Sequence, residues 1–171
     1  MTPSTSHAWP RASADALCAA ENSGRVLGID LGDRRIGLAM SDEGRVLATP
    51  HRVLERSRDR TRDHLAIAAE VEEWGVTQVV VGLPLSLDGS VGRAAKKAIT
   101  EAKQLGVVSG VPVDTYDERL TTVSAHQVLR ERGVAGPDRR REVDKVAAAV
   151  LLQAWLDTQA HAGADGSPAP D

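Results

Sequence analysis

The chain of 171 residues is long enough to form one domain with a substantial hydrophobic core. Its formal net charge of −3 excludes a globally basic nucleic-acid-binding protein. Its few aromatic residues (no Phe, one Tyr, three Trp) argue against single-strand binding by base stacking. Any nucleic acid would therefore be held mainly through its phosphates.

Cysteine content and the start of the chain indicate the compartment. The single cysteine, Cys18, excludes an intrachain disulfide and agrees with a reducing environment. Residues 1–8 contain no Lys or Arg and so lack the basic start of a signal peptide, and no apolar run reaches the length of a membrane span. We therefore expect a cytoplasmic protein that does not associate with a membrane.

Composition predicts one domain between two flexible ends. Residues 1–24 are rich in Ser, Ala and Pro and show little hydrophobic periodicity, and residues 161–171 are rich in Gly, Ala and Pro. We expect a flexible N-terminal extension over 1–24, a folded domain over 25–160 and a disordered tail over 161–171.

Three strands are predicted in quick succession at the start of the domain. The first, over 25–31, is an apolar run bounded by turn signals, which is typical of a buried central strand. The second is expected over 35–41, and the third begins near Arg45. Because the two connections are short and rich in Gly and Asp, the three strands are predicted to form an antiparallel meander.

Helices and strands alternate in the rest of the domain. A helical period begins near Thr61 and is stopped by Gly75, and a fourth strand follows over 78–82. Ser90 is the expected N-cap of a second helix that closes at Gly106, before a fifth strand over 111–116. Two further helices are predicted, one from Thr121 or Thr122 to Arg132 and a last one for which Asp138 is the candidate cap.

This order of elements predicts an α/β fold. Alternating strands and helices favour parallel pairing with helices on the faces of the sheet. We expect one mixed five-stranded sheet, three antiparallel strands followed by two parallel ones, with helices on both faces.

Three carboxylates stand on predicted structural elements. Asp30 interrupts the buried first strand, where an uncompensated carboxylate is costly. Glu118 follows the fifth strand, where active sites of open α/β sheets gather, and Asp144 shares a helix face with Ala148 and Leu151. Each has a structural alternative: a turn at Asp30, a surface charge cluster at 117–119, and a favourable helix dipole at Asp144. Together they favour a divalent-metal site.

Four motifs occur in the order found in one known family. They are Gly28-Ile29-Asp30-Leu31-Gly32-Asp33-Arg34-Arg35-Ile36-Gly37-Leu38-Ala39, Val81-Gly82-Leu83-Pro84-Leu85, Asp117-Glu118-Arg119-Leu120-Thr121-Thr122 and Asp144-Lys145-Val146-Ala147-Ala148. This set resembles the YqgF/RuvX family, RNase H-like nucleases described as acting on precursor 16S rRNA or as Holliday junction resolvases. The resemblance covers about residues 25–157.

The resemblance implies an active site and its chemistry. It makes Asp30, Glu118 and Asp144 the acidic triad of a metal-dependent endonuclease, with Mg²⁺ or Mn²⁺ as the cofactor. The implied substrate is precursor 16S rRNA, trimmed at its 5′ end in ribosome biogenesis, or a four-way DNA junction. Some related resolvases carry a second acid three residues before the helix carboxylate, and Arg141 occupies that position here.

Two groups of basic residues are candidates for holding phosphates. The first lies between the third strand and the first helix and has acidic residues nearby: Arg52, Arg56, Arg58, Arg60 and Arg62. The second has few compensating acids and is favoured for substrate: Arg130, Arg132, Arg139, Arg140 and Arg141. Arg119 and Lys145 are expected to reach the scissile phosphate. The histidines have no ligand-like spacing and are interpreted as structural or exposed: His51, His64 and His126.

Other functions fit the sequence less well than a nuclease does. An actin-type ATPase or sugar kinase also begins with Asp-x-Gly on a first strand, but it needs two such domains and this chain is too short. A non-catalytic nucleic-acid-binding module would not need all three acids. Junction resolution would require a symmetric homodimer with two active sites, which nothing in the sequence establishes.

Overall fold

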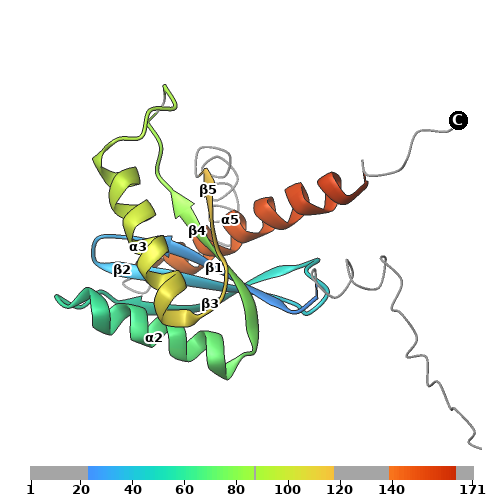
Figure 1. Cartoon of the computed structure of the whole chain (residues 1–171), viewed down its shortest axis with the longest axis horizontal. Coiled ribbons are helices and arrows are strands. Elements are labelled where there is room, and N and C mark those ends of the chain that lie inside the picture. The colour runs from blue at the N-terminus through green and yellow to red at the C-terminus, as the bar shows by residue number, and fades with distance from the viewer. Residues whose placement is uncertain (1–22, 87, 118–138, 165–171) are drawn as a thin grey trace, which may run out of the picture.

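The computed structural model describes residues 23–86, 88–117 and 139–164, with residues 139–141 and 163–164 in their backbone only. Figure 1 shows strands and helices of this part of the chain arranged around one sheet. In chain order the elements are β1 (Arg25–Leu31), β2 (Arg35–Ser41), β3 (Ala48–Glu55), α2 (Arg60–Glu73), β4 (Val76–Leu83), α3 (Arg93–Ser109), β5 (Val113–Asp117) and α5 (Arg139–Ala164).

The sheet has the predicted mixed topology. Its strand order is β3-β2-β1-β4-β5, so β1 is central. The β1–β2 and β2–β3 pairs are antiparallel, and the β1–β4 and β4–β5 pairs are parallel. The carboxyl ends of β1, β4 and β5 therefore meet at one edge of the sheet, where sites of open α/β sheets form.

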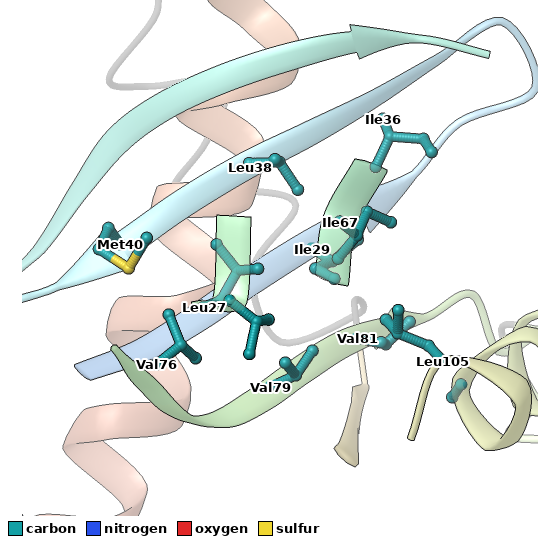
Figure 2. Close-up of a cluster of buried hydrophobic side chains, with 12 residues drawn as sticks. Leu27, Ile29, Ile36, Leu38, Met40, Ile67, Val76, Val79, Val81 and Leu105 are labelled. Carbon is teal, nitrogen blue, oxygen red and sulfur yellow. The ribbon is translucent and has the colours of Figure 1, made fainter. Parts of the chain in front are cut away.

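Alternation along the strands divides the core between the two faces of the sheet. Leu27 and Ile29 of β1 point to the side of α2 and α3, where they pack in the cluster shown in Figure 2. Val26 points to the opposite side and packs against α5, for example against Leu152. Helices therefore cover both faces, as predicted.

Two glycines bring α5 directly onto the central strands. A Cβ atom on Gly28 would lie 2.7 Å from the Leu152 Cβ, and a Cβ on Gly37 would overlap the carbonyl oxygen of Asp144. The register places Gly37 opposite Asp30. Because Gly37 has no side chain, the turn of α5 that contains Asp144 can pack against β2 next to Asp30.

Gly37→Ala is expected to lower the free energy of unfolding by about 2 kcal/mol, because the added methyl group must push α5 away from β2. Urea unfolding measures this change. Gly44→Ala is the control, because its Cβ would approach only side-chain atoms, the Asp42 Oδ2 at 3.1 Å and the Val46 Cγ2 at 3.8 Å, and no backbone atom. An equal loss of stability in both variants would contradict the packing role of Gly37.

The boundaries of several elements differ from the prediction. The third strand begins at Ala48 and not near Arg45, because the Asp42 carboxylate accepts hydrogen bonds from the backbone N–H groups of Val46 and Leu47 and lengthens the turn. The last helix continues to Ala164, beyond the domain end predicted at residue 160.

The helix α3 begins and ends later than predicted. Ser90 is not its N-cap: the Ser90 N–H donates to Asp88 and its carbonyl accepts from Ser86, so it belongs to the preceding turn, and Gly92 is the cap. Gly106 does not close the helix, which ends at Gly110 in the left-handed conformation (φ 71°). The helix predicted over 121–132 and the Asp138 cap lie outside the described residues.

Candidate active site

Asp30 lies at the carboxyl end of the central strand on the face covered by α5. Burial and, to a lesser extent, the negative charge of Asp144 together raise the pKa of Asp30 from 3.8 to about 6. The two carboxylates, 114 positions apart in the sequence (144 − 30), are therefore close enough to repel each other. This pairing is the first part of the predicted triad.

Asp144 is held by an arginine that the sequence analysis did not select. The Arg35 Nε donates a hydrogen bond to the Asp144 Oδ2 at 2.5 Å, and this bond raises the pKa of the guanidinium. The two side chains are only 24% and 27% exposed. Period-two alternation along β2 puts Arg35 on the same face as Gly37, but its partner depends on how α5 crosses the sheet.

The remaining residues of the predicted site are described only in part. β5 ends at Asp117, so Glu118 and Arg119 lie immediately beyond the described residues. Residues 139–141 form the start of α5 and are described in their backbone only. The Lys145 Nζ lies 2.5 Å from the Glu142 Oε1, so this amine is paired with a neighbouring carboxylate.

Asp30 and Asp144 are suited to supply part of the ligand set of a cation site. Within the described ranges no group of three or more His, Cys, Asp or Glu residues is suited to hold a metal ion. Asp30 and Asp144 supply oxygen donors, and their mutual repulsion is what a divalent cation would relieve. A third oxygen donor would have to come from a residue beyond these ranges, and Glu118 follows a strand that ends at the same edge.

The first arginine group is largely occupied by ion pairs, as its neighbouring acids suggested. Arg52 binds the buried Glu70, and Arg56 and Arg60 both bind the buried Glu101. His51 also contacts Glu70, and His64 is buried. These two histidines are structural, as expected, and His126 lies outside the described residues.

Comparison with known proteins decides the family. The model of the RuvX family, described as Holliday junction resolvases, matches residues 24–158. The chain belongs to the RuvX family. This membership confirms the resemblance seen in the four motifs and places the protein among hydrolases that act on phosphodiester bonds.

Several curated relatives of this RuvX-family chain carry the name "Putative pre-16S rRNA nuclease". One from Anaeromyxobacter sp. (strain Fw109-5) is 49% identical over 133 residues, covering 78% of this chain and 96% of the relative. One from Rhodococcus opacus (strain B4) is 47% identical over 138 residues and covers 78% of each chain. One from Mycobacterium leprae (strain TN) is 50% identical over 136 residues, covering 78% and 73%.

A solved structure supports the fold. RuvC of Thermus thermophilus in complex with a Holliday junction substrate superposes with a TM-score of 0.52 at 17% identity, covering 80% of this chain and 96% of that chain. The predicted RNase H-like fold is thus confirmed. In the described part of this RuvX-family chain, no helix has the length and apolarity needed to span a membrane.

Proposed function

We propose that this RuvX-family protein is a divalent-metal-dependent endonuclease whose acidic triad is Asp30, Glu118 and Asp144. The observation that carries the proposal is the pairing of two partly buried carboxylates, Asp30 and Asp144, at the carboxyl edge of the sheet. Burying one carboxylate next to another destabilises the metal-free fold, and this arrangement is reasonable where a cation compensates it.

Mg²⁺ or Mn²⁺ suits this set of oxygen donors, and such an ion would activate a water and stabilise the leaving oxygen when bound. The protein's own residues orient the reaction. Arg35 fixes the direction of the Asp144 carboxylate. We further propose that the basic residues near the triad hold the substrate phosphates: Arg119, Arg139, Arg140, Arg141 and Lys145.

The proposed substrate is precursor 16S rRNA, cut at its 5′ end during ribosome biogenesis in the cytoplasm. The names of relatives that are 44–50% identical support this choice. A second candidate is the four-way DNA junction, which the family description favours. Junction resolution would require two active sites from a symmetric homodimer.

The experiment offers both substrates to the purified protein. Precursor 16S rRNA and a four-way DNA junction are incubated in parallel with Mg²⁺ or Mn²⁺ and the wild-type protein, Asp30→Asn or Glu73→Gln. Glu73 is an exposed carboxylate at the end of α2 and serves as the control. We expect cleavage of the rRNA by the wild type and by Glu73→Gln only. Cleavage that survives in Asp30→Asn would place the activity elsewhere.

Arg35→Gln is expected to reduce cleavage by about 10–100-fold, because a partner that orients a metal-ligating carboxylate typically contributes this much. Initial rates under saturating metal measure the loss. Arg34→Gln, at the exposed neighbouring position, removes the same charge and should retain the wild-type rate. Equal rates for both variants would exclude an orienting role for Arg35.

A further inference from the structure

We propose that a pocket beside the start of α3 binds a backbone phosphate of the nucleic acid, next to the phosphate that is cut. This inference rests on the proposed nuclease function and adds a second contact to it. The pocket has a volume of about 450 Å³. Its lining includes residues 31–33 and the side chains of Arg56, Arg93, Lys97 and Glu101.

The pocket lies at the same edge of the sheet as the candidate active site. Residues 31–33 follow Asp30 directly, and Pro84, which also lines the pocket, follows the end of β4. α3 packs on the face of the sheet opposite to α5 and Asp144. A strand that crosses this edge with one phosphate at Asp30 and Asp144 would therefore bring a neighbouring phosphate to the pocket.

The start of α3 presents unpaired backbone donors. The N-cap residue Gly92 has no side chain to cap the helix, and the first N–H inside α3 that bonds back along the chain is that of Lys96, to the Gly92 carbonyl at 3.0 Å. The three preceding N–H groups, at residues 93–95, therefore lack a partner within the helix. The first turn contains no acidic residue and begins with Arg93. Cations at this position are repelled by the positive end of the helix dipole. An anion would be stabilised both by the dipole and by the cationic side chains.

A buried guanidinium in the pocket wall supplies an independent observation. The Arg56 side chain is only 6% exposed, and its NH2 group donates to both oxygens of Glu101 at 3.0 and 2.8 Å. Its Nε and NH1 make no hydrogen bond with any described residue, although NH1 lies 3.8 Å from the Asp63 Oδ2. These two donors are shielded from solvent, so Arg56 contributes a fixed, buried positive charge to the pocket wall and attracts a phosphate through this charge.

The excess of positive charge in the pocket favours an anionic ligand. Glu101 is neutralised by Arg56 and Arg60. Among the residues that the structure describes, Lys97 pairs with Asp33 alone, at 3.4 Å. The Asp33 carboxylate is 94% exposed, so this pair is weak. Arg93 forms no ion pair with another residue that the structure describes. The pocket lining has no aromatic side chain for stacking a base, so its ligand is the phosphodiester backbone.

The test measures binding without cleavage. A fluorescein-labelled single-stranded RNA of about 12 nucleotides is titrated by anisotropy against full-length protein carrying Asp30→Asn, over a range of salt concentrations. The pocket variant adds Arg93→Gln and Lys97→Gln. The control adds Lys96→Gln and Lys103→Gln, which remove equal charge from exposed positions of the same helix that do not line the pocket.

We expect the pocket variant to bind about tenfold more weakly than the control. Its slope of log affinity against log salt should be smaller by about 0.7, the contribution of the one lost phosphate contact. Arg93→Lys with Lys97→Arg should restore binding because it keeps both charges. Equal affinity and slope in the pocket variant and the control would overturn the subsite, and so would the absence of RNA binding.

Cleavage by otherwise wild-type protein separates this inference from the proposed function. If the protein cuts neither substrate but the pocket-dependent binding persists, the nuclease proposal fails and the phosphate subsite stands. If the protein cuts rRNA or junction DNA while the pocket variant binds like the control, only the subsite fails.

Discussion

Asp30→Asn is expected to abolish cleavage and, at the same time, to stabilise the metal-free protein at neutral pH. The pKa of Asp30 is raised from 3.8 to about 6 by burial and by the charge of Asp144. Above pH 6 the folded protein must keep this carboxylate ionised in an unfavourable place. A shift of this size corresponds to a penalty of about 3 kcal/mol, which the neutral Asn removes.

The pH dependence of this effect follows from the sign of the shift. Below the unfolded-state pKa of 3.8, Asp30 is protonated in both states and the penalty is absent. Between pH 3.8 and about 6 the folded state binds more protons than the unfolded state, so the stability of the wild type falls as pH rises. Above pH 6 the full penalty is present.

Urea unfolding of the wild type and Asp30→Asn at pH 4 and pH 8 measures the difference. The two proteins should be nearly equally stable at pH 4, and the variant should be more stable by about 3 kcal/mol at pH 8. Glu73→Gln, at an exposed position, should show no such difference between the two pH values. A variant that is less stable than the wild type at pH 8 would show that Asp30 is satisfied by the fold.

Mn²⁺ is expected to raise the melting temperature of the wild type strongly at pH 8 and to lose this effect below pH 6. A proton and the cation compete for the Asp30 carboxylate, and its raised pKa moves the competition to about pH 6. Below that pH each further unit weakens binding up to tenfold. At a concentration about 100-fold above the dissociation constant, the cation would stabilise the fold by about 2.7 kcal/mol.

Thermal unfolding with Mn²⁺ or with a chelator, from pH 5 to pH 8, measures this prediction. Asp30→Asn should show little stabilisation by Mn²⁺ at any pH, whereas Glu73→Gln should behave like the wild type. Stabilisation of equal size at pH 5 and pH 8 would argue that the cation binds away from Asp30.

The strands could be predicted from the sequence because each is a short apolar run between turn residues. The ranges 25–31 and 35–41 agree with β1 and β2, and the central position of β1 follows from its apolar character. The limits of α3 could not be predicted. Ser90 and Gly106 have the residue types of helix caps, but Ser90 hydrogen-bonds within a turn and Gly106 packs near Val113 inside the helix.

Two members of the candidate site were found from the sequence because a carboxylate on a buried strand or on an apolar helix face stands out. Arg35 and the α3 pocket were missed for a common reason. The partner of Arg35 is fixed by the crossing of α5 over Gly37, and the pocket forms between the end of β1 and the start of α3. Both depend on contacts between elements distant in the chain, which local patterns do not specify.

The buried charges near α3 were missed in a similar way. Asp63, Glu70 and Glu101 lie on faces that the helical period assigns partly to solvent, yet all three are buried. They are buried because arginines from β3 and its following loop reach across to them. The proximity of acidic and basic residues in the sequence suggested that the arginine charges are neutralised, but it did not indicate that the acidic partners are buried.

The most direct test of the metal-dependent triad is anomalous diffraction from crystals of the full-length protein grown with Mn²⁺. We expect an anomalous peak within coordination distance of the carboxylates of Asp30, Glu118 and Asp144. A structure in which Mn²⁺ binds elsewhere, with Glu118 remote from Asp30, would contradict the proposed active site.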